Sequence, residues 1–455
     1  MMNEQSAADK PSGYFLRDRL PVAIVGGGYS GTILAAKLAC LGIASFLIDG
    51  SGLVGRGTAY STSEPTHLLN VAAQSMSAFA DEPDHFAEHF AAHGGDRADY
   101  AERRFFGHYL DDILQSTIAT GNVVPVGARA VAAERGAATW VIRLEDGREL
   151  ESNALVLALG NQSPEPMAVF AEVGPKYIAN PWGAEARVAI AGAVRSGGDV
   201  LLLGTGLTMI DTILSLGSAG FAGSITALSR RGQVPRSHGH VEVAPVELDE
   251  IPSGDLVGLW RWLRRRSAAV GWRAAIDSLR PHSHALWNSL SIDQQKRFMR
   301  HARPYWDVHR HRIAPQVARQ IAELVAEGRL QILAGRVLGA RDAGSAIEVE
   351  LRRRGSTTSE RRQFALVVNC TGPLHALERT TDPLLRGLID SGAVGLDPLG
   401  IGLRLEAGAK VAGAERLWAM GALTKGHYWE IIAVPDIRHQ AAWIAAEIAK
   451  ELGHG

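Results

Sequence analysis

A glycine-rich turn near the beginning of the sequence constrains the fold more than any other feature. Gly26, Gly28 and Gly31 follow the apolar segment VAIV directly and precede a helical pattern. In a turn that binds a dinucleotide, the first glycine allows the tight bend, the second lets the backbone approach the pyrophosphate, and the third lets helix and strand pack closely. Asp49 ends the next strand, where a carboxylate can accept hydrogen bonds from ribose hydroxyls. With Ser30 at the start of the helix, these residues predict a dinucleotide site.

A second strand, turn, helix and strand occupy residues 199–232. The turn has Met209 where a third glycine would stand, which predicts looser packing of the helix. The second strand ends in two arginines, which can neutralise the 2′-phosphate of NADPH, although a solvated basic turn is the alternative. Two such units predict a tightly held FAD, a diffusing NADPH and hydride transfer between them. The cofactor-binding residues predicted here are Gly204, Thr205, Gly206, Arg230 and Arg231.

Charge and cysteine content exclude several classes of protein. The formal net charge is -1, so the chain lacks the long-range field that attracts nucleic acid or an anionic membrane. Cys40 and Cys370 lie far apart without a C-x-x-C motif, which excludes a dithiol centre of that type, and both are expected in the core. No segment reaches 18 uninterrupted apolar residues. We therefore expect a cytoplasmic protein that acts on a small-molecule substrate.

The order of the predicted elements indicates an α/β protein with two Rossmann-like dinucleotide-binding domains and a helical insertion. The insertion is rich in tryptophan and has a helical pattern, whereas strands return after it. The predicted parts are 1–20, a flexible N-terminal tail; 21–195, the first part of the FAD-binding domain; 196–244, the first part of the NADP-binding domain; 245–328, the insertion and a substrate region; 329–372, the return strands of the NADP-binding domain; and 373–455, the last part of the FAD-binding domain.

Several residues outside the two turns are expected near the cofactors. Gly160 ends a strand where the chain crosses between the domains, and Gly421 follows the apolar strand LWAM, beside the flavin. Asn70 is the catalytic candidate, because its amide can bond the flavin edge or the nicotinamide, or else satisfy its own turn. His67 is a cofactor-binding candidate, with a packed histidine as the alternative. A helix beginning near Tyr428 would direct its N–H groups at the flavin.

Residues 297–312 carry five arginines and three histidines against one acid, Asp307. Three interpretations remain open: a clamp for a substrate carboxylate, a contact to an NADPH phosphate, or a structural ion network. No metal site is predicted, because no cysteine or suitably spaced acid completes one with His309 and His311. The predicted substrate-binding residues are Arg303, Trp306, His309, Arg310, Arg312 and Tyr428.

The chain resembles a bacterial family of FAD/NAD(P)-binding proteins within the flavoproteins that have two dinucleotide-binding domains. The resemblance is carried by the first glycine turn and by GRGTAYST, HLLNVAAQSMSAF, DEPDHF, RRFFGHYL, GTGLTMID, LSRRG and RPYWDVHRHRIAP. The family is similar to flavin-dependent N-monooxygenases, in which NADPH reduces FAD and oxygen forms a C4a-hydroperoxide. This similarity implies that O2 and the amine of a small, even acidic, amino acid are the substrates. Gly421-Ala422 departs from the glycine-aspartate pair common in flavoproteins, so the contact there is expected from the backbone.

Two alternatives to a monooxygenase remain. One is an NADPH:acceptor oxidoreductase or oxidase that inserts no oxygen, and the other is a flavoprotein whose redox state controls a partner. Arginines that bind NADPH argue against the second, since a sensor does not need that cofactor. The sequence does not distinguish a monooxygenase from an oxidase, because the difference depends on how completely the active site excludes water.

Overall fold

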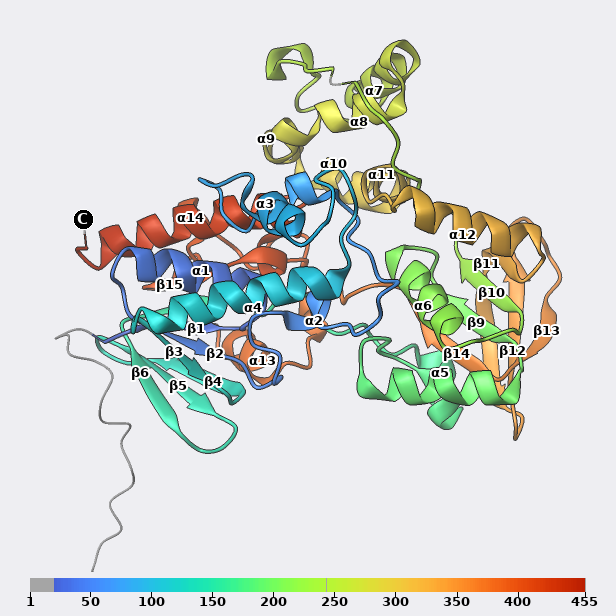
Figure 1. Ribbon diagram of the computed structural model, residues 1–455, viewed down its shortest axis with the longest axis horizontal. Coiled ribbons are helices and arrows are strands. Elements are labelled where there is room, and N and C mark those ends of the chain that lie inside the picture. The colour runs from blue at the N-terminus through green and yellow to red at the C-terminus, as the bar shows by residue number, and fades with distance from the viewer. Residues whose placement is uncertain (1–19, 243, 455) are drawn as a thin grey trace, which may run out of the picture.

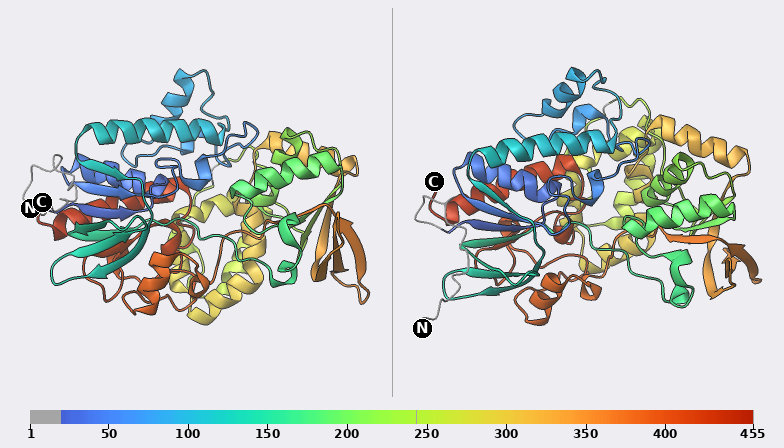
Figure 2. Two further views of the ribbon diagram at one scale, coloured as in Figure 1. Left: turned by 90° about the horizontal axis from the view of Figure 1, so that it is seen from below. Right: turned by 60° about the horizontal axis from the view of Figure 1, so that its bottom comes forward.

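The computed structural model describes residues 20–242 and 244–454, so all but one residue of the predicted tail lie outside the described residues. Two α/β domains lie side by side, and a group of helices projects above them in Figure 1. Both views in Figure 2 show the same two lobes joined by extended segments. The chain therefore has the architecture of a flavoprotein with two dinucleotide-binding domains.

The first domain is built on a parallel sheet with the strand order β15-β7-β1-β2-β3. Its strands are β1 (Val22–Val25), β2 (Ser45–Ile48), β3 (Val123–Val126), β7 (Ala154–Leu157) and β15 (Leu417–Ala419). All residues of β1, β7 and β15 are buried, because elements cover both faces of the sheet. The buried core on one face is contributed by α1 (Tyr29–Cys40), α4 (Arg103–Ala119) and α14 (Val434–Glu451). The other face packs against α13 (Pro383–Asp390) and a three-stranded antiparallel sheet, β4 (Ala130–Arg135), β5 (Trp140–Leu144) and β6 (Glu149–Ser152).

Two shorter helices, α2 (Gly57–Tyr60) and α3 (His85–Ala92), complete the first domain beside α4. Cys370 is buried as expected, but the expectation for Cys40 is wrong. Cys40 is the last residue of α1 and is exposed, because the helix ends there at a turn on the surface.

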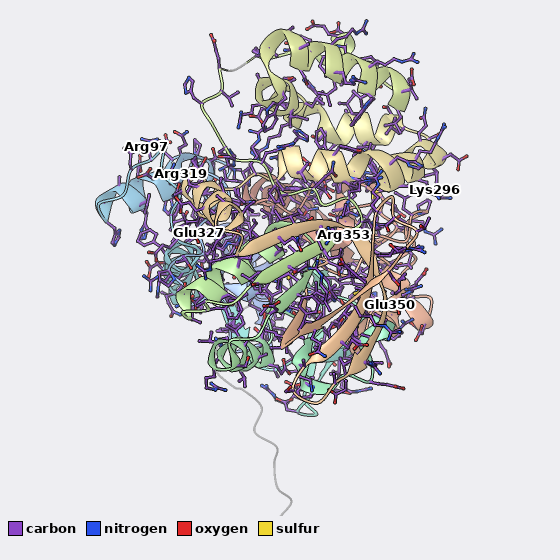
Figure 3. The ribbon with its side chains drawn as sticks, turned by 90° about the vertical axis from the view of Figure 1, so that its right-hand side faces the viewer. Arg97, Lys296, Arg319, Glu327, Glu350 and Arg353 are labelled. Atoms are coloured by element: carbon purple, nitrogen blue, oxygen red, sulfur yellow. The ribbon has the colours of Figure 1, made fainter. Side chains whose placement is uncertain are left out.

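The second domain contains a mixed sheet with the order β13-β12-β11-β10-β9-β14-β8. Its strands are β8 (Tyr177–Ile178), β9 (Val200–Leu203), β10 (Ile225–Ser229), β11 (Leu330–Asp342), β12 (Ile347–Arg353), β13 (Glu360–Phe364) and β14 (Leu366–Asn369). The strands from β8 to β11 run parallel, whereas β12 and β13 are antiparallel additions. The core on one face is formed with α5 (Ala184–Ser196), α6 (Leu207–Ser218) and α12 (Pro315–Ala326). Figure 3 views this domain from its outer edge, where Glu350 and Arg353 of β12 lie.

The structure differs from the expected domain limits at three elements. Helix α5 lies almost wholly within the range expected for the first domain, yet its Ala186 and Ala193 join the core of the second domain. Strand β8 lies within the range expected for the first domain, yet it pairs with β14 of the second sheet. Helix α12 lies within the range expected for the insertion, yet its Val317 and Ile321 join the core of the second domain. It therefore serves as the crossover helix between the parallel strands β10 and β11. The sequence could not indicate these assignments. Strand β8 has only two residues, and the helical pattern of the insertion continues into α12 without a break.

The insertion proper has its own small core above the second sheet, as Figure 3 shows. Its helices are α7 (Leu256–Val270), α8 (Trp272–Ser278), α9 (Ser283–Ser289), α10 (Ile292–Arg297), the π-helical turn η6 (Phe298–Ala302) and α11 (Arg303–Arg310). Within the described ranges, no helix is long and apolar enough to cross a membrane.

Candidate functional site

The packing of the chain itself requires the first and third glycines of the first turn. Gly26 has a φ of +110°, and a Cβ there would lie 2.2 Å from the carbonyl oxygen of Ala158. A Cβ on Gly31 would lie 1.9 Å from the carbonyl oxygen of Gly26. A side chain at either position would therefore collide with backbone, as the sequence predicted.

Gly28 is different, because the space in front of it is open. It is the N-cap of α1, and a Cβ there would meet only Gly57, whose Cα is 3.4 Å away. No side chain caps this end of α1, and its first turn contains no acid. The unpaired N–H groups can therefore donate hydrogen bonds to the phosphates of a dinucleotide, and the positive end of the helix dipole attracts their charge.

Asp49 binds the glycine turn through its carboxylate. The amide of Gly27 donates to Oδ2 at 2.7 Å, and the amide of Ser51 donates to Oδ1 at 2.7 Å. The predicted position of Asp49 at the end of β2 is therefore accompanied by a structural role, since it orders both the turn and the loop after the strand. Any bond to a ribose would use the remaining acceptor capacity of these oxygens.

The second turn repeats the geometry of the first at its beginning. Gly204 also has a φ of +110°, and a Cβ there would lie 2.3 Å from the carbonyl oxygen of Cys370. Gly206 is the N-cap of α6, and a Cβ there would meet nothing within 4 Å. Met209 is fully buried in the core of the second domain. The second turn thus also presents an uncapped helix terminus.

Thr205 is held inside the second domain. Its Oγ1 lies 2.9 Å from Ser229 Oγ and donates to the carbonyl of Gln233. These bonds fix the turn after β10 that carries Arg230 and Arg231. Arg231 lies over the ring of Tyr305 at 5.5 Å, whereas Arg230 is exposed and has no ion pair with any described residue.

His67 joins the two domains. Its Nε2 donates to the carbonyl of Asp211 at 2.9 Å and lies 3.0 Å from Ser215 Oγ, while Nδ1 lies 2.9 Å from Thr62 Oγ1. The ring is buried, so both nitrogens have partners within the protein. These contacts favour the interpretation of His67 as a packed histidine over that of a cofactor ligand.

A buried ion pair lies next to His67. Arg103 of α4 contacts Asp211 of α6 at 3.1 Å, and both side chains are largely buried. Burial raises the pKa of the Asp211 carboxyl, whereas the Arg103 guanidinium and His67 lower it. Asn70 lies nearby and accepts a hydrogen bond at its carbonyl from His238 Nε2 at 2.9 Å. No hydrogen bond of the Asn70 side chain is formed with the described residues, so its amide remains available for the predicted cofactor contact.

The turn η9 (Gly421–Thr424) follows β15 as the sequence predicted for Gly421. The Gly421 amide donates to Gln440 Oε1 at 2.7 Å, and a Cβ on Gly421 would lie 3.2 Å from Ser30 Oγ. Gly421 and Ser30 are therefore brought together beside the first turn. Helix α14 begins at Val434, so the segment around Tyr428 leads into the last helix without being part of it. Tyr428 instead packs against Trp443, with ring centroids 5.3 Å apart.

Strand β7 is followed by Gly160, which adopts a φ of +64°. The next residue, Asn161, accepts a hydrogen bond at Oδ1 from Lys425 Nζ at 3.1 Å. The crossover after β7 and the turn after β15 are thus in contact. Both segments were predicted to bind the same cofactor, which requires that they lie close together. Lys425 itself was not predicted, although a lone lysine in the apolar segment MGALTKG was a usable signal.

The basic segment forms ion pairs within the protein. Arg310 Nε donates to Glu430 Oε2 at 3.0 Å, and the indole of Trp306 donates to the other oxygen of Glu430. Arg312 is 3% exposed and forms a bidentate pair with Asp277, at 3.0 and 2.9 Å. These contacts favour the structural ion network over a substrate clamp for Arg310 and Arg312.

The remaining candidates of this segment are partly buried. His309 Nδ1 lies 2.7 Å from the carbonyl of Tyr305, and its ring packs against Trp272 at 5.0 Å. Arg303 Nε donates to Asp307 Oδ2 at 3.2 Å, while its Nη2 reaches His375 at 3.3 Å. Of the predicted substrate residues, Arg303 alone contacts the crossover that follows β14. Within the described part of the chain, no group of three or more His, Cys, Asp or Glu residues could hold a metal ion.

Sequence comparisons agree with this geometry. Residues 23–162 match a family model described as FAD-NAD(P)-binding. The match covers the first turn, Asp49, Asn70 and Gly160, but not the second turn. A search of curated proteins found no significant match.

Solved structures share the fold over almost the whole chain. L-lysine 6-monooxygenase from Pseudomonas syringae is 17% identical with a TM-score of 0.66, covering 95% of this chain and 99% of that one. An ornithine N-hydroxylase from Kutzneria sp. 744, solved with reduced FAD, NADP⁺ and L-ornithine, is 14% identical with a TM-score of 0.65, covering 95% and 100%. Thioredoxin reductase from Lactococcus lactis is 12% identical with a TM-score of 0.54, covering 95% and 100%. At these identities the comparisons establish the fold alone.

Proposed function

We propose that this protein is a monooxygenase that binds FAD at the first glycine turn and NADPH at the second, and that oxygenates the amine nitrogen of a small substrate. The observation that carries the proposal is the pair of uncapped helix termini at Gly28 and Gly206, one in each domain. The second is adjoined by Arg230 and Arg231, the residue type that binds a 2′-phosphate. The solved N-hydroxylating enzymes with this fold support the choice of reaction.

The residues present fit both cofactors. The amides at the start of α1 would hold the FAD pyrophosphate, and those at the start of α6 would hold that of NADPH. Bound FAD would accept a hydride from NADPH and activate oxygen. The turn at Gly421, tied to Gln440, would present backbone N–H groups to the flavin, and the Asn70 amide would orient either ring system. Small amino acids, including acidic ones, are the first substrates to test.

The test is an analysis of the products formed under ¹⁸O₂. Purified protein loaded with FAD is supplied with NADPH and a panel of amino acids and simple amines under ¹⁸O₂. We expect one substrate to accelerate NADPH oxidation and to gain one ¹⁸O atom as a hydroxylamine. If NADPH oxidation yields only hydrogen peroxide with every substrate, the monooxygenase proposal is wrong.

A second function is favoured by the similarity to thioredoxin reductase, which this chain matches over that enzyme's whole length. An NADPH:acceptor oxidoreductase would use the same two sites without inserting oxygen. The single buried Cys370, with no cysteine partner nearby, gives it no disulfide to relay electrons. In the same assay, rapid reduction of a quinone or dye by NADPH without labelled product would favour this function.

A further inference from the structure

Four basic side chains from four separate segments meet between the two domains. Arg230 follows β10, Arg303 begins α11, His375 follows β14 and Lys425 follows η9. Arg303 Nη2 lies 3.3 Å from His375 Nε2, and the charges of Arg230 and Lys425 are close enough to affect the same imidazole. Arg230 and Arg303 belong to the second domain and its insertion, His375 lies in the segment that returns to the first domain, and Lys425 belongs to the first domain. We call these residues the interdomain basic cluster.

The cluster contains more positive charge than its neighbours neutralise. Among the described residues, neither Arg230 nor Lys425 forms an ion pair, and Lys425 has only the neutral amide of Asn161, at 3.1 Å. Arg303 is paired with Asp307 at 3.2 Å, but that carboxylate also lies 3.9 Å from His311. Asp307 is thus shared between Arg303 and His311, and its charge also acts on Lys425.

The titration of the cluster reflects this imbalance. Burial, with the charge of Arg303, lowers the pKa of Lys425 to about 8, although Asp307 opposes the change. Desolvation, with the charges of Arg303, Lys425 and Arg230, lowers the pKa of His375 to about 3, so its ring is neutral. Because a guanidinium can only donate, His375 Nε2 accepts from Arg303 and Nδ1 carries the proton. His375 is therefore a neutral donor beside three cations.

Like charges brought together without counterions destabilise the folded chain. Such an arrangement is characteristic of a site that binds an anion, because the ligand supplies the missing charge. We propose that the interdomain basic cluster is an anion-binding site that takes a phosphate or carboxylate group of a small molecule bound between the domains. Arg303 supplies a planar pair of donors, Lys425 a point charge, and His375 Nδ1 a neutral hydrogen bond.

Two ligands could bring this anion, and only the choice between them rests on the proposed function. Arg230 lies at the turn expected to hold NADPH, so a cofactor phosphate could extend to the cluster. Lys425 lies four residues after Gly421, at the turn expected beside the flavin, so a substrate carboxylate could reach it too. Both have the same chemistry, negatively charged oxygens that accept several hydrogen bonds.

The experiment measures equilibrium binding to the FAD-loaded protein by calorimetry, with inorganic phosphate, succinate and NADP⁺ as probes. The variants are Lys425→Met and Arg303→Met, and Lys296→Met is the control, because Lys296 is an exposed lysine of α10 without an ion pair. We expect Lys425→Met to weaken the binding of phosphate or succinate about tenfold or more, as for a lost charge-assisted hydrogen bond. The control should bind all three probes like the wild type.

The outcomes separate the two sources and the two proposals. If Lys425→Met weakens NADP⁺ and phosphate together, the cofactor supplies the anion; if it weakens succinate alone, the substrate does. Wild-type affinity for all three probes in both folded variants would overturn the anion site. Should Arg303→Met fail to fold because Asp307 loses its partner, Lys425→Met decides alone, since Lys425 has no ion pair to strand. None of these measurements requires turnover, so the site can stand even if no amine is oxygenated.

Discussion

The two glycine turns begin alike and end differently. Gly26 and Gly204 share a φ of +110°, and each is packed against a carbonyl of the crossover strand beside it, Ala158 or Cys370. At the third position the first turn requires Gly31, whereas the second tolerates Met209 in the core. In both domains, therefore, the neighbouring strand requires the bend at the first glycine. The distance between the helix and the turn differs between the domains and depends on the residue at the third position.

The surroundings of the two turns differ in charge as well. The first turn is bonded to the carboxylate of Asp49, and the second to a serine hydroxyl, Ser229, followed by two arginines. A carboxylate suits a ribose with free hydroxyls, and arginines suit a phosphorylated one. The difference in charge thus predicts that the first turn binds a cofactor with free ribose hydroxyls and the second a cofactor with a 2′-phosphate. The following variants test this prediction.

The largest effects are expected from Gly28→Val and Gly206→Val. A Cβ at either position would meet no backbone atom closer than 3.4 Å, so each side chain would extend in front of an uncapped helix. We expect Gly28→Val to be folded and colourless, and Gly206→Val to retain FAD but lose NADP⁺ binding. Flavin absorbance and calorimetry measure both. Gly339→Val, also in open space but on β11, is the control. A Gly28→Val protein with a full content of FAD would show that the flavin binds elsewhere.

A smaller effect should separate the third positions. Gly31→Ala forces α1 away from the turn, so we expect a loss of about 1–3 kcal/mol in unfolding free energy, together with weaker FAD retention. Met209→Ala leaves a cavity and should cost about 2–5 kcal/mol, but the folded fraction should bind NADP⁺ normally. Urea unfolding and cofactor titration distinguish the two. Equal cofactor losses would mean that the third position governs binding in both turns.

The charge contrast predicts an effect on coenzyme choice. Replacing Arg230 and Arg231 together by alanine should raise the KM for NADPH at least tenfold, equivalent to about 1.4 kcal/mol, and leave that for NADH nearly unchanged. Initial rates with the two coenzymes measure the ratio. If both KM values rise equally, the arginines do not recognise the 2′-phosphate. The difference in charge between Asp49 and the two arginines would then not determine which cofactor each turn binds.

The smallest effect concerns pH and Lys425, the member of the interdomain basic cluster that the first domain contributes. The folded protein holds the pKa of Lys425 at about 8, below the ordinary value of 10.5. Between these values the unfolded chain binds more protons, so this lysine makes the folded state more stable as the pH rises from 8 to 10.5. Below pH 8, Lys425→Met should be more stable than wild type by up to about 1 kcal/mol, and the difference should vanish by pH 10.5.

Denaturant titrations at pH 7 and above 10 measure the difference for Lys425→Met, with Lys296→Met as the control. Arg303, Asp307, His375 and Asn161 are the groups that face this amine. A difference that is the same at both pH values would show that the lysine charge is already compensated in the free protein.

Local sequence patterns predicted the parts of the structure that depend on local geometry. The two turns, their strands and the positions of Gly160 and Gly421 follow from glycines placed after apolar runs. The same reasoning did not predict the partners of the basic segment. Asp277 and Glu430 lie 35 and 120 residues from Arg312 and Arg310, and no periodicity connects residues so far apart.

His67 illustrates the same limit at the boundary between the domains. Its partner Asp211 is 144 residues away on another domain, so its two occupied nitrogens could not be foreseen from the loop around it. Domain limits failed for a similar reason. The assignment of β8 depends on pairing with β14, and that of α12 on packing against a distant sheet.

The buried pair of Arg103 and Asp211 has a mechanical consequence. The chain crosses between the domains twice, before β8 and after β14, and two adjacent crossings alone would form a hinge about which one lobe could swing. The pair, with His67 beside it, fastens α4 to α6 at a third point. Three separated attachments leave a rigid body no axis of rotation unless one of them breaks. The two domains should therefore behave as one rigid body, with the same relative orientation before and after a ligand binds.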